Sequence, residues 1–277
     1  MKLIDVHAHL EDGRFEKDLD SVIERFKEAG GKFVINSGTD PEKNRKTLEL
    51  FKSFDCVRCS FGMYPIGDYE DVDGELVWIE EHKDVCVAVG EIGLDFDKGR
   101  EDFEKQEKLF RKMLRFAKKI DKPVVIHSRK AELEVIDILE EEGFGKTASL
   151  PDRGGAPARP ASPARPLRCQ TAGRGKVVMH CFSGKKSLIK RCVENGWSFS
   201  VPPAIMRWDN FKMLVDMVPL GQLLTETDSP YLSPVAGERN EPANVAVTIK
   251  EIARIKGVSE DEVAERIWEN AERVFKI

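Results

Sequence analysis

The 277-residue sequence has no apolar run long enough to span a membrane, and its N-terminus lacks the apolar segment of a signal peptide. We therefore expect a cytoplasmic protein without a membrane partner. Positive charge is not in excess either, because 44 lysines and arginines against 49 aspartates and glutamates give a net charge of −5. Any attraction of nucleic acid must then come from bound metal ions or a local basic patch.

Cysteine is scarce for a chain of this length, since six cysteines in 277 residues do not make a disulfide framework. Cys56 and Cys59 form a lone C-x-x-C pair, which on a strand would face opposite sides. Buried thiols are favoured there over a zinc or redox site. A glycine-rich phosphate turn after the first apolar run is also missing, which weighs against a dinucleotide-binding fold.

The sequence alternates short buried strands with amphipathic helices. Strands are expected at Leu3–Val6, with His7 and His9 at the C-terminal end, and at residues 32–37, 57–63, 85–92, 123–127, 176–181, 197–201 and 223–227. Helices are expected at residues 15–29, 41–53, 74–82, 102–120, 131–142, 186–195 and 208–218, and two more close the chain. Eight such units predict a single α/β domain over residues 1–277, a (β/α)8 TIM barrel, with an open doubly wound sheet as the alternative.

Residues 147–175 do not fit this pattern. The stretch is rich in Pro, Arg, Ala and Gly, contains no lysine, and shows neither helix nor strand periodicity. It is interpreted as a disordered insertion before the sixth strand. Its arginines could contact a polyanion, but a solvated loop or translated out-of-frame DNA is favoured.

Two histidines at the end of the first strand suggest half of a metal site. His7 and His9 are two residues apart, so on a strand their imidazoles point to the same side. Two nitrogen ligands on one rigid face suit a transition metal. Histidines satisfied within the core are the alternative for either residue.

Other strand ends add polar residues to this pair. The complete set is His7, His9, Glu91, His127, His180 and Asp228. In a barrel these ends share one rim, where catalytic residues gather. Glu91 or Asp228 taken alone could be a helix N-cap. Together, four imidazoles and two carboxylates exceed what one catalytic zinc needs and suit two divalent cations, with Glu91 able to bridge them.

Five motifs resemble those of the TatD family of metal-dependent deoxyribonucleases, within the amidohydrolase-like TIM barrels. They are Asp5-Val6-His7-Ala8-His9-Leu10, Gly90-Glu91-Ile92-Gly93-Leu94-Asp95, Pro123-Val124-Val125-Ile126-His127-Ser128-Arg129, His180-Cys181-Phe182-Ser183-Gly184 and Glu226-Thr227-Asp228-Ser229-Pro230-Tyr231-Leu232 followed by Arg239-Asn240-Glu241-Pro242. The resemblance spans nearly the whole chain apart from residues 147–175.

The resemblance implies two divalent cations, such as Mg²⁺, Mn²⁺ or Zn²⁺, and hydrolysis of DNA, often from the 3′ end. His7, His9, Glu91 and Asp228 would hold one cation, and Glu91, His127 and His180 the other. One departure is Tyr64-Pro65, where the family often has His-Pro at a position thought to face substrate.

Roles follow for the remaining candidates. Asp228 is the candidate to orient or deprotonate the attacking water. Asp95 could orient a metal ligand by hydrogen bonding to it from outside the coordination sphere. Arg129 and Arg239 are candidate phosphate clamps, with a surface salt bridge as the alternative. Tyr64, Phe182 or Trp208 could stack on a base, although packing in the core or rim is favoured.

Two other functions compete with a deoxyribonuclease. A metal-dependent amidohydrolase or lactonase acting on a small molecule could use the same barrel, although such enzymes often bridge their metals with a carboxylated lysine where Glu91 stands. A non-catalytic metal-binding scaffold would not need ligands from so many strands. No stable protein partner is implied, and we expect a monomer with DNA as its substrate.

Overall fold

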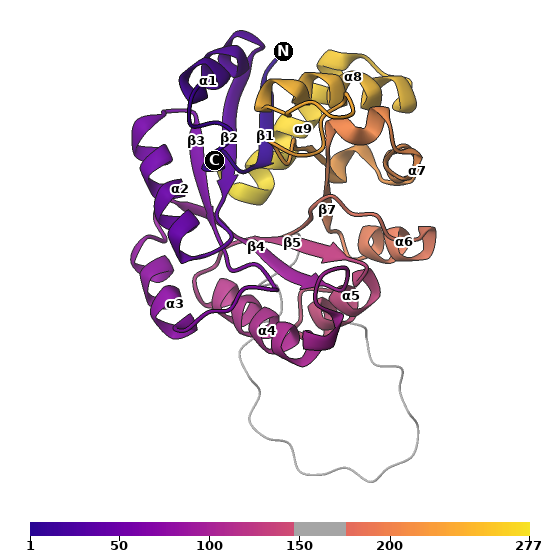
Figure 1. The fold of residues 1–277 in the computed structure, drawn as a ribbon. Helices are drawn as coiled ribbons and strands as arrows, with labels where there is room; N and C mark the ends of the chain where they lie inside the picture. Colours follow the sequence, from indigo (N-terminus) through magenta and orange to yellow (C-terminus); the bar gives the residue numbers. More distant parts are fainter. Residues whose placement is uncertain (147–175) are drawn as a thin grey trace, which may run out of the picture.

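The computed structural model describes residues 1–146 and 176–277, in which eight parallel strands are hydrogen-bonded in chain order from β1 to β8. Helices surround the strands on the outside (Figure 1). The strands are β1 (Leu3–Ala8), β2 (Gly31–Ser37), β3 (Val57–Phe61), β4 (Cys86–Asp95), β5 (Val124–Arg129), β6 (Val177–Met179), β7 (Ser198–Val201) and β8 (Leu223–Thr225). The predicted (β/α)8 barrel is confirmed, while the insertion predicted at residues 147–175 lies outside the described residues.

The helices follow the predicted alternation. They are α1 (Leu19–Glu28), α2 (Pro41–Ser53), α3 (Val72–Glu81), α4 (Phe103–Lys119), α5 (Glu132–Glu141), α6 (Lys186–Glu194), α7 (Asp209–Met217), α8 (Val245–Lys256) and α9 (Glu260–Phe275). Local chemistry sets several of their starts. The Asp40 side chain caps α2 by accepting from the Lys43 N–H, and Ser259 caps α9 by accepting from the Glu262 N–H.

The first helix begins later than predicted. The apolar spacing indicates a start at Phe15, but α1 begins at Leu19. Phe15 is fully buried within a preceding turn, where its N–H donates to the Asp12 carbonyl at 2.9 Å. A buried side chain in a turn satisfies the same apolar periodicity as a helical one, so the pattern alone could not separate the two.

Hydrogen bonds join the first and last strands and close the barrel. The Thr225 hydroxyl donates to the Ile4 carbonyl at 2.7 Å, and beyond β8 the Asp228 N–H donates to the His7 carbonyl at 2.8 Å. The His9 N–H donates in turn to the Ser229 carbonyl, also at 2.8 Å. The seam therefore holds the histidine pair of β1 against the segment that carries Asp228.

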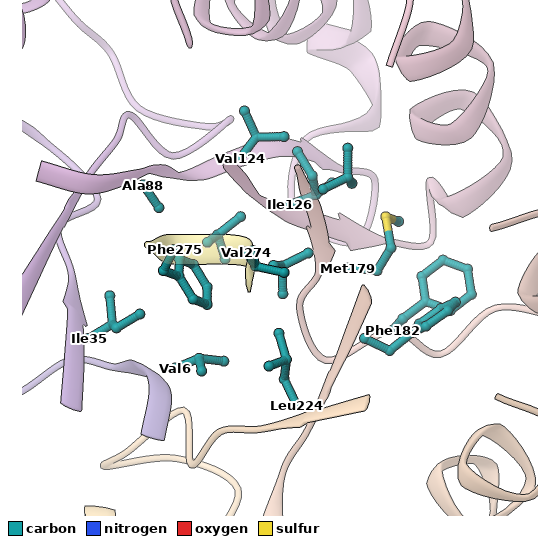
Figure 2. Packing of buried hydrophobic residues seen from close by; sticks show 14 of the residues in the cluster. Val6, Ile35, Ala88, Val124, Ile126, Met179, Phe182, Leu224, Val274 and Phe275 are labelled. Atoms are coloured by element: carbon teal, nitrogen blue, oxygen red, sulfur yellow. The ribbon is translucent and has the colours of Figure 1, made fainter. Parts of the chain in front are cut away.

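The C-terminal helix closes the end of the barrel at which the strands begin. Asn270 of α9 donates to the carbonyl of Leu223, the first residue of β8, at 2.8 Å. Figure 2 shows Val274 and Phe275 of α9 among strand side chains that include Val6 and Leu224. This end is filled by apolar packing, which leaves the opposite end for polar chemistry.

The cysteine expectation also holds, since Cys56 and Cys59 are both buried free thiols. Among the described residues, no helix combines the length and the apolar character needed to cross a membrane.

Candidate metal centre

A cavity of about 1390 Å³ opens among the loops that follow the strands. Five of the six predicted ligands line it: His9, Glu91, His127, His180 and Asp228. The sixth, His7, is fully buried beside them. The structure therefore brings the whole set together at the end of the barrel at which the strands finish, as parallel strands of one barrel require.

Four donor atoms form the first group. His7 Nε2 and His9 Nε2 are 3.2 Å apart, and Glu91 Oε2 lies 3.5 Å from the first and 3.6 Å from the second. Asp228 Oδ1 lies 3.6 Å and 3.3 Å from the same two nitrogens. A tetrahedral ion with bonds of about 2.1 Å separates its ligands by roughly 3.4 Å. The spacing of His7, His9 and Asp228 fits a single divalent cation, and these three residues form one candidate metal group of the described chain, while His7, Glu91 and His180 form another.

The other oxygen of Glu91 faces a second group. Glu91 Oε1 lies 2.7 Å from His127 Nδ1 and 4.0 Å from His180 Nε2. The His180 ring stacks on the His7 ring with centroids 3.8 Å apart, so the two groups of donors are in direct contact. The two oxygens of Glu91 thus point to different histidine pairs, which is the arrangement of a bridging carboxylate.

Hydrogen bonds on the outer side of the rings set which nitrogen is free to coordinate. His9 Nδ1 lies 2.9 Å from the Ser37 carbonyl, His180 Nδ1 lies 2.6 Å from Glu226 Oε2, and His127 Nε2 lies 3.2 Å from Asp95 Oδ2. Each acceptor calls for a proton on the nitrogen that faces it. The opposite nitrogen then carries a lone pair directed into the cluster, as metal-bound histidines require.

The charges of the cluster are arranged to receive a cation. Burial opposes ionisation of Glu91, yet the neighbouring His127 and His7 hold its pKa well below the ordinary value. Burial likewise opposes ionisation of Asp228, and His9 nevertheless lowers its pKa. Both carboxylates are therefore ionised at neutral pH, and positive charge beside them is what stabilises them.

Burial and the neighbouring carboxylates also shift the pKa values of the histidines. Burial lowers the pKa of His7, whereas at His9 the carboxylates of Asp228 and Glu11 together outweigh burial and raise the pKa. Burial is also outweighed at His180, where Glu226 raises the pKa to about 9. Cations at the cluster would replace these protons.

The predicted partner Asp95 lies behind His127, and Tyr64 joins the same network. The Tyr64 hydroxyl donates to Asp95 Oδ2 at 2.7 Å and lies 3.1 Å from His127 Nε2. Tyr64 also lines the cavity. The Tyr64 hydroxyl thus donates to Asp95, the hydrogen-bond partner of the candidate metal ligand His127. The sequence did not indicate this contact.

The structure separates the two predicted phosphate clamps. Arg129 lines the cavity, and no carboxylate within residues 1–146 and 176–277 pairs with it. Arg239 is instead held by both oxygens of Asp18, at 2.6 and 2.7 Å, and by the Arg14 carbonyl. The salt-bridge alternative describes Arg239, which binds the loop after β1 to the loop after β8.

The aromatic candidates also differ. Phe182 is buried against Phe199, with ring centroids 5.6 Å apart, so it packs in the core. Trp208 remains 41% exposed at the cavity wall.

Sequence reasoning missed Glu226 and Asp5 as functional residues. The fully buried Glu226 accepts from the Cys181 N–H at 2.9 Å in addition to holding His180. Asp5 accepts from the His7 and Thr227 N–H groups, and burial raises its pKa to about 8. The available signal was their position, since Asp5 stands two residues before His7 on β1 and Glu226 directly follows β8, two residues before Asp228.

A (β/α)8 barrel with histidines and carboxylates where its strands finish has the architecture of a metal-dependent hydrolase, and the relatives of this chain agree. A family model described as TatD related DNase matches residues 4–276, so the chain belongs to the TatD family. The chain is 32% identical to the uncharacterized metal-dependent hydrolase YabD of Bacillus subtilis, with 99% of each chain covered. It is 31% identical to deoxyribonuclease TATDN3 of Homo sapiens, with 99% of this chain and 94% of the relative covered.

A solved structure of a TatD homolog has the same fold. The structure of YJJV, a TatD homolog from Escherichia coli, superposes with a TM-score of 0.82 at 24% identity, covering 99% of this chain and 98% of that one. This likeness supports the barrel.

Proposed function

We propose that this TatD-family hydrolase is a deoxyribonuclease that uses two divalent cations to hydrolyse DNA phosphodiester bonds as a 3′–5′ exonuclease. The observation that carries the proposal is the placement of Glu91, whose two oxygens face separate histidine pairs. The name of the human relative, deoxyribonuclease, supports DNA as the substrate.

The residues fit two cations of the Mg²⁺, Mn²⁺ or Zn²⁺ class. His7, His9, Glu91 and Asp228 would hold one, and Glu91, His127 and His180 the other. When bound, the cations supply Lewis acidity toward a phosphate oxygen and lower the pKa of water.

Side chains of the cavity supply the remaining steps. Asp228, ionised because its pKa is low, accepts the proton of the attacking water. The water oxygen bonds to phosphorus as the P–O3′ bond breaks, and a proton goes to the departing 3′ oxygen. The products are a 5′-mononucleotide and a strand shortened by one residue with a 3′-hydroxyl. Arg129 would donate to the phosphate oxygens.

The test uses metal-stripped protein and oligonucleotides labelled at the 3′ or the 5′ end, with one cation added back at a time. We expect a ladder that shortens from the 3′ end, and Glu91→Gln should cleave at least about 100-fold more slowly. Glu251→Gln is the matched control, because Glu251 is a buried carboxylate of α8 paired with Arg254 at 2.7 Å, away from the cavity.

Cleavage by Glu91→Gln at the wild-type rate would overturn the proposal. A wild-type protein that leaves every oligonucleotide intact, but hydrolyses amides or lactones in a Glu91-dependent way, would establish the small-molecule alternative.

A further inference from the structure

The carboxylates and the unpaired cations that line the cavity come from different segments of the chain. The side formed by α2 and the segment after β3 contributes five carboxylates: Asp40, Glu42, Asp68, Glu70 and Asp71. The cations on this side are paired, since Lys43 lies 3.3 Å from Asp40 and Arg45 lies 2.5 Å from Glu75. A polyanion would be repelled from this side of the cavity.

The other side, which follows β4, β5 and β7, carries cations without such partners. Lys98, Arg129 and Arg207 line the cavity and are exposed, and within the described parts of the chain no carboxylate forms an ion pair with any of them. Arg129 stands two residues after His127 on β5, so both point to the same face of the strand. It therefore lies next to the metal cluster.

Arg207 is fixed in orientation although its charge is unpaired. Its Nε–H donates to the Ser233 carbonyl at 3.0 Å, which leaves the two terminal nitrogens free to donate elsewhere. Its guanidinium lies 5.3 Å from the centre of the Trp208 ring. An anchored guanidinium loses less freedom when it binds a phosphate.

Two aromatic rings at the cavity remain exposed, and one of them, Trp208, lies beside Arg207. Trp208 is 41% exposed and stacks on Phe211, with centroids 5.9 Å apart and planes 20° apart. Tyr231 is 48% exposed and lies edge-on to His9, with centroids 6.4 Å apart. Large apolar side chains that stay exposed beside a polar site are typical of a binding surface.

We infer that Lys98, Arg129 and Arg207 bind successive phosphates of the substrate strand and that Trp208 stacks on an unpaired base of the same strand. This inference rests on the proposed function and specifies its substrate contacts. The strand would follow the β4, β5 and β7 side of the cavity, away from the carboxylates, and reach the metal cluster at Arg129.

The phosphate contacts are tested by the salt dependence of binding. Fluorescence anisotropy of a hydrolysis-resistant phosphorothioate oligonucleotide on the metal-loaded protein gives log K against log salt concentration. Arg129→Gln, Arg207→Gln and Lys98→Gln should each make the slope shallower by about 0.7–0.9, the value of one phosphate contact. Arg115→Gln removes the same charge from a residue paired with Glu142 at 2.7 Å outside the cavity, and it should leave the slope unchanged.

The stacking contact is tested with an abasic strand. Trp208→Ala should weaken binding of a normal oligonucleotide by about ten-fold without changing the salt slope. The same variant should bind an abasic oligonucleotide of equal length as tightly as the wild-type protein does.

The outcomes separate this inference from the proposed function. The inference would be overturned if the salt dependence of binding were unchanged in all three charge variants, or if Trp208→Ala lost equal affinity for normal and abasic strands. The proposed function would still stand in either case, provided that the wild-type protein cleaves DNA. If the wild-type protein binds no DNA at any salt concentration, both are overturned. Melting temperatures equal to that of the wild-type protein confirm that each variant is folded.

Discussion

Glu226 determines which nitrogen of His180 faces the metal cluster, and replacing it with glutamine tests this directly. In the wild-type protein the Glu226 carboxylate accepts a hydrogen bond from His180 Nδ1 at 2.6 Å, which leaves the Nε2 lone pair on the side of Glu91. Glu226→Gln keeps the shape, and its carbonyl can still accept from the Cys181 N–H. The amide then presents N–H groups to Nδ1, which favours the proton on Nε2 and blocks coordination.

Two effects of Glu226→Gln oppose each other, and pH decides which is larger. Loss of the orienting partner should weaken metal binding 10- to 100-fold, or about 1.4–2.7 kcal/mol. In the wild-type protein, however, Glu226 raises the pKa of His180 to about 9, so at pH 7 a cation must displace a proton, which costs binding free energy. This cost is small at pH 9, because the pH then matches the pKa of His180. Without the Glu226 carboxylate, burial opposes the proton on His180 more strongly, while Asp228 and Glu91 still favour it, so this cost is smaller in the variant.

The expected result is therefore a difference that grows with pH. Wild-type protein and Glu226→Gln should bind Zn²⁺ with similar affinity at pH 7, and the variant should bind 10- to 100-fold more weakly at pH 9. Competition with a chelator of known zinc affinity measures both, and Glu251→Gln is the control for loss of a buried carboxylate outside the site. Equal affinities for wild type and variant across this pH range would refute the orienting role of Glu226.

Two further variants test the surroundings of the cluster. Tyr64→Phe removes the hydroxyl 3.1 Å from His127 Nε2, and the number of cations bound with high affinity, measured by calorimetry, should fall from two to one. Tyr69→Phe removes a hydroxyl whose hydrogen bonds, within the described residues, go to the backbone carbonyls of Thr39 and Tyr64, and this variant should still bind two cations. Equal stoichiometry in both variants would contradict the role of Tyr64. Gly93→Ala should lower the free energy of unfolding by about 3 kcal/mol or more, because φ is +148° and a Cβ would lie 1.9 Å from the His127 carbonyl oxygen. Chemical denaturation measures this against Gly221→Ala, where the site is open, and equal stabilities would show that the backbone adjusts freely.

The sequence by itself determined the barrel and which six side chains the barrel brings together as candidate metal ligands. Strands and helices differ in the period of their apolar residues, and that period is local, so it can be read without coordinates. Parallel strands all finish at the same rim of the barrel. Polar residues at strand ends, such as His7 and Asp228, must therefore lie together there. Exact ends were less certain, as the late start of α1 after the buried Phe15 shows, because a turn can bury the same side chain as a helix.

Only the tertiary structure decided how each side chain is paired. Arg129 and Arg239 look alike in sequence, yet Arg239 is neutralised by Asp18, which is 221 residues away, while Arg129 faces the cavity without a carboxylate. The pairing of His180 with Glu226, 46 residues away, is of the same kind. A hydrogen bond depends on tenths of an ångström between residues that the barrel brings together from distant segments, and no local pattern encodes such a distance.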